Sequence, residues 1–395
     1  MGQVREVVVL SGVRTAIGSY GGSLKDIPPT ELGAQVIREA VRRSGVNAAD
    51  IGHVVFGNVI HSEPRDMYLS RVAAIKGGIL EGTPALTLNR LCGSGLQAIV
   101  SAAQTVLLED AEFAVAGGAE SMSRGLFAVP SARWGARLGD AGMVDMMVGA
   151  LTDPFDSIHM GVTAENIAAK FAISRNQQDA FAVESHRRAT NAIQKGYFKD
   201  QILPVELKNK KGTVLFDTDE HARTDVTAEG LAKLKAVFQK DGSVTAGNSS
   251  GLNDGAAAVI LGERSAAERK GLKPLARLVA YGHAGVDPKF MGMGPVPAVT
   301  KAMQRAGLRV GDMDVIESNE AFAAQACAVS NELKFDSAKA NPNGGAVALG
   351  HPIGATGCIL TVKAVYELHR ISGRYALVTM CIGGGQGIAA IYERL

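Results

Sequence analysis

The sequence predicts an α/β protein made of two duplicated halves with an unrelated segment inserted between them. Residues 37–51 are repeated at residues 299–313 with a constant offset of 262, which aligns Ala40 with Ala302 and Gly45 with Gly307. Such self-similarity indicates an internal repeat. Short apolar runs alternate with longer apolar or amphipathic stretches in both copies, as expected for sheets covered by helices. Residues 122–252 match neither copy.

The elements of each half follow from these runs. Helices are expected over residues 96–108 and 358–368, each directly after a glycine-rich turn. The offset of 262 aligns Asn89 with His351 and Gly95 with Gly357, so the two turns are equivalent. Duplicated halves pack about a pseudo-twofold axis, and we therefore expect Cys92 to lie near His351. Strands are expected at residues 6–10, 53–57, 85–88, 113–116, 256–261, 278–281, 315–318 and 375–380.

The chain is long enough for two or three domains, since it has 395 residues. We expect one half to comprise residues 1–121 and 253–274, and the other to comprise residues 275–395. The inserted segment, residues 122–252, contains Trp134, the single tryptophan, and a charged stretch from residue 200 to 241. Two interpretations of the segment remain open at this point: a lid over a ligand, or a solvated surface subdomain without a ligand role.

Composition excludes several classes of protein. With 46% hydrophobic and 20% charged residues the chain is globular. The net charge of +2 and the few aromatic residues argue against a nucleic-acid partner. Apolar runs are far shorter than a membrane span and the N-terminal residues do not resemble a signal peptide, so we expect no membrane association and a cytoplasmic location. The four cysteines suit neither a disulfide framework nor a zinc site, and no metal is expected.

Cys92 is the first candidate for chemistry. It lies in the turn Asn89-Arg90-Leu91-Cys92-Gly93-Ser94-Gly95, at the expected start of a helix. The unpaired N–H groups and the positive end of a helix favour an anion, which would make the thiol easier to ionise. The flanking glycines allow another group to approach the sulfur closely. The alternative is a buried, inert cysteine.

The second half supplies a histidine and another cysteine in similar turns. His351 lies in the stretch of residues 350–357 and Cys381 in the stretch of residues 380–387, both rich in glycine. An imidazole titrates near neutral pH and can take the proton of Cys92. The alternative for His351 is a core histidine that satisfies backbone groups. Six other histidines are expected to be surface or structural residues: His53, His61, His186, His221, His283 and His369.

Together these motifs resemble the thiolases, the family of 3-ketoacyl-CoA thiolases (β-ketothiolases) and acetyl-CoA acetyltransferases. The resemblance covers nearly the whole chain and implies a five-layered αβαβα core with an inserted loop domain that holds coenzyme A. It also implies an acyltransferase that performs the Claisen condensation of two acyl-CoA molecules and the reverse thiolysis. The motifs are residues 89–95, Gly117-Gly118-Ala119-Glu120-Ser121-Met122, Asn319-Glu320-Ala321-Phe322, Gly350-His351-Pro352-Ile353-Gly354 and Cys381-Ile382-Gly383-Gly384-Gly385.

The resemblance implies a role for each catalytic residue. Cys92 carries the acyl group in ping-pong chemistry, because its thioester matches CoA in leaving ability. His351 takes the proton of Cys92. Cys381 takes a proton from the methyl carbon of the second acetyl-CoA. One oxyanion hole is formed by the N–H groups of Cys92 and Gly383, and a second by His351 Nε2 and a water held by Asn319.

Coenzyme A and acyl-CoA are expected as substrates, and no prosthetic group is expected. Arg223 could cover the adenine or meet a phosphate, and Ser250 could bond the pantetheine amide. Met160 and Met291 are expected to line the acyl end of the site. The positions that match the family's CoA contacts are Leu151, His159, Met160, Arg223, Phe238, Ala246, Ser250, Ala321 and Phe322.

Residues 122–145 resemble the loop through which many bacterial thiolases pair dimers into tetramers. We therefore expect a homotetramer, a dimer of dimers, with a dimer as the alternative. Relatives of this kind act in fatty acid metabolism and in polyhydroxyalkanoate biosynthesis. The residues do not decide between synthesis and breakdown, and they do not set the accepted acyl chain length.

Three other functions are alternatives to this one. Ketosynthases and hydroxymethylglutaryl-CoA synthases share the superfamily but use Cys-His-His or Cys-Glu-His sets, so Cys381 argues against both. A noncatalytic CoA-binding or acyl-CoA-binding relative would not need to retain Cys92, Asn319, His351 and Cys381 together. A thiol-redox enzyme would form a reversible disulfide between Cys92 and Cys381.

Overall fold

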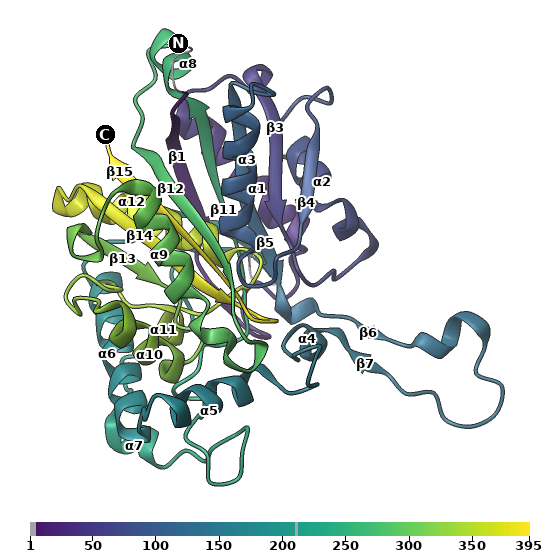
Figure 1. Cartoon of the computed structure of the whole chain (residues 1–395). Helices are drawn as coiled ribbons and strands as arrows, with labels where there is room; N and C mark the ends of the chain where they lie inside the picture. The colour runs from purple at the N-terminus through teal and green to yellow at the C-terminus, as the bar shows by residue number, and fades with distance from the viewer. Residues whose placement is uncertain (1–4, 210–211) are drawn as a thin grey trace.

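The computed structural model describes residues 5–209 and 212–395, and its largest element is an eleven-stranded mixed sheet (Figure 1). The main strand order is β13-β14-β15-β12-β1-β11-β5-β3-β4. The two halves join where β1 pairs with β12. Short strands β2 (Gly18–Ser19) and β8 (Ile202–Leu203) pair with β11 and β1. The bounds are β1 Val7–Thr15, β3 Ile51–Gly57, β4 Ala85–Leu88, β5 Phe113–Ser121, β11 Asn253–Glu263, β12 Ala276–Gly285, β13 Val315–Ser318, β14 Tyr375–Ile382 and β15 Gln386–Arg394.

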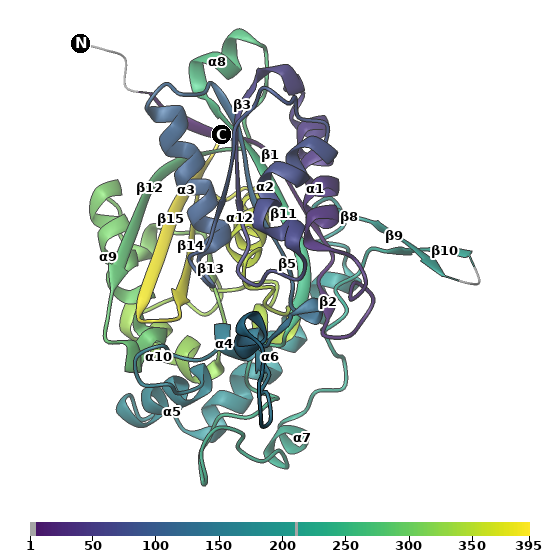
Figure 2. The ribbon, with the colours of Figure 1, turned by 90° about the vertical axis from the view of Figure 1, so that its right-hand side faces the viewer.

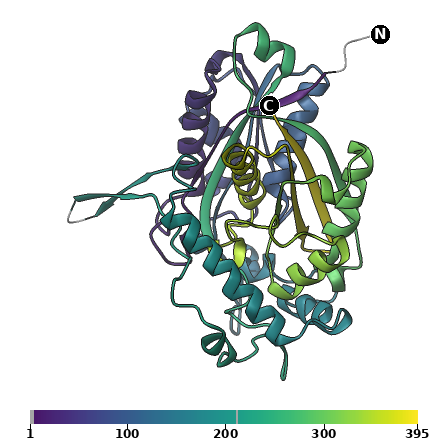
Figure 3. The ribbon, with the colours of Figure 1, turned by 90° about the vertical axis from the view of Figure 1, so that its left-hand side faces the viewer.

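Helices cover the sheet in layers. Helices α1 (Pro29–Ser44) and α2 (Leu69–Lys76) pack on the first half, and α9 (Pro295–Ala306) packs on β12, β14 and β15 of the second half. Helices α3 (Ser94–Leu107) and α12 (Thr356–Ile371) pack against each other between the strands of the two halves. Figures 2 and 3 show this central pair from opposite sides. The predicted αβαβα layering is therefore confirmed.

The duplication is visible in the element boundaries. Helices α3 and α12 begin at Ser94 and Thr356, and strands β5 and β14 begin at Phe113 and Tyr375, both with the offset of 262 seen in the sequence. The equivalent glycines lie at the contact between the helices. A methyl group on Gly95 would lie 2.8 Å from the backbone nitrogen of Cys358, and one on Gly357 would overlap the backbone nitrogen of Leu96. Glycine at both positions lets the halves touch backbone to backbone.

Strand β15 was not among the predicted strands. It lies between β14 and β12, and its residues from Gly387 to Glu393 are all buried. A strand buried on both faces does not alternate between apolar and polar residues, so the usual period of two is lost. The predicted strands are present, and most run a few residues further than the apolar runs suggested.

The segment between the halves forms its own group of helices at one end of the sheet (Figure 1). Helices α5 (Met160–Lys170) and α6 (Arg175–Gln194) pack against α10 (Ala323–Leu333) of the second half. The shorter helices of the segment are α4 (Met146–Ala150) and α7 (Ala228–Ala232). Two other short helices, α8 (Arg264–Arg269) and α11 (Ala346–Leu349), lie outside it.

Two hairpins project from the segment. The arm, residues 125–145, contains β6 (Phe127–Ala128) and β7 (Val144–Asp145) and extends away from the body in Figure 1. The other hairpin pairs β9 (Val205–Asn209) with β10 (Gly212–Phe216) and extends sideways in Figure 2. A fully buried, bidentate ion pair between Arg14 on β1 and Asp219, with N···O distances of 2.7 and 2.9 Å, ties the segment to the sheet.

Candidate active site

A cavity of about 450 Å³ lies where the two halves and the inserted segment meet. All predicted site residues except Asn319 and Arg223 line it, so one space brings together residues from three distant parts of the chain. The predicted residues in its wall are Cys92, Leu151, His159, Met160, Phe238, Ala246, Ser250, Met291, Ala321, Phe322, His351, Cys381 and Gly383.

Cys92 lies in a tight turn between β4 and α3. Leu91 adopts a left-handed conformation with φ of 45°, which is unusual for a residue with a side chain. Hydrogen bonds from side chains hold this turn. The Leu91 N–H donates to Asn89 Oδ1 at 2.8 Å, the Ser94 hydroxyl donates to the Leu91 carbonyl at 2.7 Å, and the Arg90 N–H donates to Ser94 Oγ at 2.8 Å. Cys92 is half-buried and opens onto the cavity. The turn thus holds the Cys92 sulfur near the N-terminus of α3.

Cys381 reaches the same cavity from the end of β14. A methyl group on Gly93 would lie 2.5 Å from Cδ1 of Ile382, so only glycine allows the Cys92 turn to pack directly against the end of this strand. Beyond Ile382 the chain turns through Gly384 and Gly385, both at positive φ. The backbone N–H groups of Gly383 and of Cys92 itself lie close enough to the Cys92 sulfur to lower the pKa of its thiol.

His351 is held on three sides. Its backbone N–H donates to Asn253 Oδ1 at 2.9 Å, and its ring Nδ1 lies 2.6 Å from Thr356 Oγ1. Ring Nε2 lies 3.3 Å from Asn319 Nδ2. The imidazole is therefore fixed in one orientation with one nitrogen engaged by Thr356.

Asn319 follows β13 and contacts the cavity only through His351. Its backbone N–H donates to the Thr379 carbonyl at 3.0 Å. Its side-chain oxygen is buried and has no hydrogen-bond partner among the described residues. A buried amide oxygen without a partner is costly, and a water bound there would satisfy it.

Burial controls the charges of the three central groups. It raises the pKa of the Cys92 thiol to about 11, against the two N–H donors that lower it. Burial lowers the pKa of His351 to about 4 and, together with the nearby Cys92, raises the pKa of Cys381. We expected the helix terminus to make Cys92 easier to ionise, but the pKa of its thiol is raised, because desolvation outweighs the nearby N–H donors. The resting groups are two thiols and a neutral imidazole.

One wall of the cavity is aromatic. The rings of His159 and Phe238 stack with centroids 4.7 Å apart and an interplanar angle of 13°. Phe322 meets Phe238 edge to face at 6.1 Å. Gly161 has no room for a methyl group because Phe238 occupies that space. Such a wall suits an extended, largely apolar ligand arm.

A second apolar wall around Cys92, formed by the base of the arm, was not predicted from the sequence. His221 was expected to be a surface or structural residue, but it is half-buried and lines the cavity. The single signal for the missed wall was the run of methionines in an otherwise atypical segment. The lining residues that were not predicted are Leu91, Met122, Met147, Val148, Ala150, His221, Val237, Ser249, Gly251, Leu252 and Ile353.

Arg223 lies outside the cavity. Its side chain is exposed, and its backbone N–H donates to His186 Nδ1 at 3.2 Å. Two residues away, His221 lines the wall. A ligand that reached from Cys92 past His221 would leave the enclosed space near Arg223, so contact of Arg223 with CoA stays a prediction.

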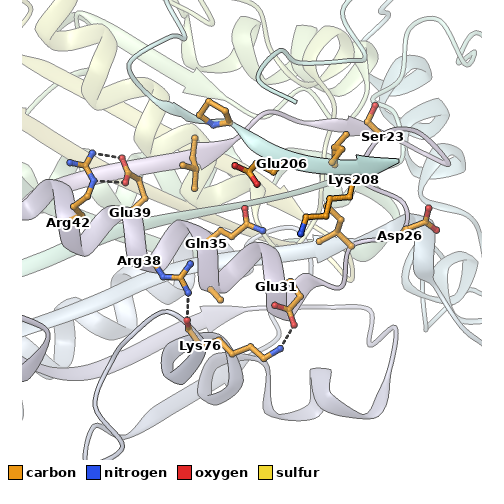
Figure 4. Close-up of a pocket in the computed structure, with 15 residues that line it drawn as sticks. Ser23, Asp26, Glu31, Gln35, Arg38, Glu39, Arg42, Lys76, Glu206 and Lys208 are labelled. Atoms are coloured by element: carbon orange, nitrogen blue, oxygen red, sulfur yellow. Dashed lines mark hydrogen bonds and ion pairs between the residues drawn. The ribbon is translucent and has the colours of Figure 1, made fainter. Parts of the chain in front are cut away.

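A larger hollow of about 900 Å³ lies between α1 and the β8–β9 region (Figure 4). Its charged side chains pair mainly with one another: Arg42 with Glu39, and Lys76 with Glu31. Arg38 donates to the Lys76 carbonyl. No predicted site residue lines this hollow. Size alone therefore does not identify the active site.

Within residues 5–209 and 212–395, no three His, Cys, Asp or Glu side chains gather in a way that could hold a metal ion. In the same residues, none of the helices combines the length and apolar character that crossing a membrane requires.

Comparison with known proteins agrees with this geometry. Residues 7–265 match the family model "Thiolase, N-terminal domain" and residues 272–394 match "Thiolase, C-terminal domain". The chain is 69% identical to Beta-ketothiolase BktB of Cupriavidus necator, over 99% of this chain and 100% of the relative. It is 49% identical to an acetyl-CoA acetyltransferase of Pseudomonas aeruginosa, over 99% and 100% of the two chains.

Solved structures give the same result. The acetyl-CoA acetyltransferase of Bacillus anthracis superposes with a TM-score of 0.98 at 45% identity, and all of both chains is covered. Human mitochondrial 3-ketoacyl-CoA thiolase in complex with CoA superposes with a TM-score of 0.96 at 45% identity, with 99% of this chain and 98% of the human chain covered. The chain therefore belongs to the thiolase family.

Proposed function

We propose that this thiolase is an acyltransferase that condenses two acyl-CoA molecules, one of them acetyl-CoA, to a 3-ketoacyl-CoA and free CoA, and that it also runs the reverse thiolysis. The observation that carries the proposal is the cavity shared by Cys92, His351 and Cys381. Acyl transfer followed by carbon–carbon bond formation needs a nucleophile, its base and a second base within one space.

The first half-reaction acylates Cys92. The thiol attacks the thioester carbonyl, and its proton passes to Nε2 of the neutral His351. The bond between the carbonyl carbon and the CoA sulfur breaks, and the departing CoA thiolate takes the proton of Cys381. Acyl-Cys92, an imidazolium and the Cys381 thiolate remain. The raised pKa of Cys381 makes that thiolate a strong base.

The second half-reaction forms the carbon–carbon bond. The Cys381 thiolate takes a proton from the methyl carbon of acetyl-CoA, and the enolate attacks the carbonyl carbon of acyl-Cys92. The carbon–sulfur bond breaks, and His351 returns its proton to the Cys92 sulfur. All three side chains then have their original protons, so one cycle converts two acyl-CoA molecules to the product and CoA.

Two oxyanion sites support these steps. The N–H groups of Cys92 and Gly383 lower the pKa of the Cys92 thiol and so lie near its sulfur. An oxygen on the carbon bonded to that sulfur would lie within their reach. The enolate oxygen would bind His351 Nε2 and a water on Asn319, whose amide oxygen needs a partner. Donors fixed where charge develops stabilise the transition state most.

Coenzyme A would enter along the inserted segment, with pantetheine beside the stacked His159 and Phe238 and the nucleotide near Arg223. This proposal favours a substrate-binding role for the segment over a solvated subdomain. We retain the division into residues 1–121 with 253–274, residues 122–252 and residues 275–395. The CoA complex of the human relative is consistent with a CoA substrate.

We also propose a homotetramer assembled through the arm. Along it, large apolar side chains are exposed: Phe127 by 60%, Trp134 by 87%, Leu138 by 101% and Met143 by 70%. A monomer in water rarely extends such a row of apolar side chains on a projecting hairpin. A second copy of the chain would cover them.

Acetyl labelling tests the division of roles. Incubation with acetyl-CoA should add one acetyl group per subunit, on Cys92, as measured by mass spectrometry of the protein and its peptides. Cys92→Ala should abolish the label, and residual label elsewhere would mean that the nucleophile is wrong. Cys381→Ser should keep a detectable label but nearly eliminate condensation. Equal loss of both half-reactions would contradict the assignment of Cys381.

The acyl range can be measured with CoA-dependent cleavage of 3-ketoacyl-CoAs of increasing length. A sharp fall beyond four carbons would indicate an acetyl-specific enzyme, and a shallow decline would indicate a broad 3-ketothiolase. Absence of acetoacetyl-CoA cleavage would instead favour a noncatalytic CoA-binding protein.

A further inference from the structure

Glu120 is a fully buried carboxyl group that the mechanism above does not use. It lies near the end of β5, opposite Gly255 of β11, and its exposed fraction is 0%. It does not line the cavity. An isolated buried carboxylate costs several kcal/mol, so its surroundings must compensate for this cost.

Four N–H groups donate to Glu120. Oε1 accepts from Asn58 Nδ2 and from the Ile60 N–H, each at 3.1 Å. Oε2 accepts from the Val59 N–H at 3.1 Å and from the Gly354 N–H at 2.8 Å. Three of these donors belong to the first half. The fourth, the Gly354 N–H, makes the shortest of the four hydrogen bonds and belongs to the turn of the second half that carries His351. Burial raises the pKa of Glu120 to about 8, and the backbone donors oppose that shift. Because every partner is a donor, the ionised carboxylate is the form whose hydrogen bonds the site satisfies.

The His351 turn is seated in a socket of glycines from the first half. A methyl group on Gly57 would lie 2.8 Å from the Gly354 carbonyl oxygen, and one on Gly95 would lie 3.1 Å from it. A methyl group on Gly118 would overlap the same oxygen. The Gly354 carbonyl is thus enclosed by β3, α3 and β5, while the Gly354 N–H is bound by Glu120.

The other end of the turn is held by the neighbouring strand. Asn253, the first residue of β11, accepts from the His351 N–H at 2.9 Å and donates to the Gly18 carbonyl at 3.0 Å. Glu120 and Asn253 lie at the same end of paired strands. Two polar side chains of the first half therefore fix the turn at residues 351 and 354.

We infer that Glu120 is a positioning residue for catalysis: its carboxylate locks the His351 turn of the second half onto the first half and thereby sets the imidazole against Cys92. This inference rests on the proposed roles of Cys92 and His351. The lock works through geometry, because the Gly354 N–H has a single acceptor.

The same carboxylate also acts on Cys92 through its charge. Its negative charge raises the pKa of the Cys92 thiol, while the N–H groups of Gly383 and Cys92 lower it. Cys381 and His351 share the cavity with the thiol, and Asp66 is the other acid whose charge affects Glu120. Geometry and charge at residue 120 can be separated by two substitutions.

Glu120→Gln keeps the shape but removes the charge and one acceptor. We expect kcat for acetoacetyl-CoA thiolysis to fall about 10- to 100-fold, the range for a buried hydrogen bond to a charged group. KM should stay within about threefold, because Glu120 does not touch the cavity. Alkylation of Cys92 by iodoacetamide at pH 8, followed by peptide mass spectrometry, should become faster because the thiolate fraction rises.

Glu120→Asp keeps the charge but shortens the reach, so kcat should fall while Cys92 alkylation keeps its rate. The matched control is Glu263→Gln. Glu263 is a buried residue at the end of β11 that lies away from Glu120, and its carboxyl group accepts from the Ala266 N–H at 2.7 Å. It should leave both kcat and alkylation unchanged.

Two results would overturn the inference: wild-type kcat in Glu120→Gln, or a loss of kcat with unchanged or slower Cys92 alkylation, which would indicate a merely structural role. If Glu120→Gln does not fold, wild-type kcat in Glu120→Asp overturns it equally. Failure of the proposed function is distinguishable, because it would appear as absent thiolysis in the wild-type enzyme, whereas alkylation needs only the Cys92 thiol.

Discussion

Thr356→Val tests whether the ring orientation of His351 matters for acylation. The threonine hydroxyl lies 2.6 Å from His351 Nδ1 and 2.9 Å from the Pro352 carbonyl oxygen. The hydroxyl has one proton, and when it donates to Pro352 the ring must donate Nδ1–H to Thr356 Oγ1. Nε2, which lies 3.3 Å from Asn319 Nδ2, then has the lone pair that takes the Cys92 proton. Thr356 therefore selects the tautomer that the proposed first step needs.

Valine has nearly the same shape but no hydroxyl, so the buried Nδ1 loses its partner. An unsatisfied buried group costs about 1–3 kcal/mol, which corresponds to about 5- to 150-fold in rate if the cost falls on the acylation step. We expect single-turnover acetylation of Cys92, followed by intact mass, to slow by such a factor.

Thr361→Val is the matched control. Thr361 is buried on the same helix and its hydroxyl donates to the Gly357 carbonyl at 3.0 Å, so this substitution removes a similar hydrogen bond without touching His351. Its acetylation rate should stay within about twofold of the wild-type rate. The reasoning is refuted if Thr356→Val acetylates at the wild-type rate, or if both variants slow equally.

Two further predictions concern pH and assembly. Burial lowers the pKa of His351 to about 4, so its imidazole stays neutral on acidification from pH 7 to 5. We therefore expect kcat/KM to stay constant over this range and to fall with a midpoint near pH 4. A midpoint near 6.5 would show an ordinary histidine at this step. Replacing Trp134 and Leu138 of the arm by serine should convert tetramers to dimers in light scattering while thiolysis per subunit is retained. A wild-type enzyme that is already dimeric, or a variant that stays tetrameric, would contradict the proposed assembly.

Much of the fold could be predicted from the sequence because the repeat is local and exact in spacing. The offset between Ser94 and Thr356 appears in both the sequence and the helix starts. Strand β15 could not be found in the same way, because burial on both faces removes the periodic pattern. The arm also gave no such signal, since its conformation depends on contacts that the repeat does not contain.

The candidate site likewise contains residues that the sequence could predict and residues that it could not. Cys92, His351 and Cys381 lie in or beside glycine-rich turns, and the glycines themselves indicate that the backbone is closely approached there. All three residues line one cavity. The wall that includes Met147, Val148 and Leu252 could not be read from spacing, because a non-repeated loop places it. The charge state of Cys92 was also missed, since a local rule about helix ends contains no information on desolvation by distant residues.

The offset of 262 also pairs Cys92 with Gly354 and Asn89 with His351. At each equivalent position only one copy has the reactive side chain, and the two reactive side chains come from different copies. A symmetric pair of separate identical halves would have to place the same residues in both of the equivalent turns. Joining the copies in one polypeptide removed that restriction. One turn could then supply the nucleophile, Cys92, and the other the base, His351.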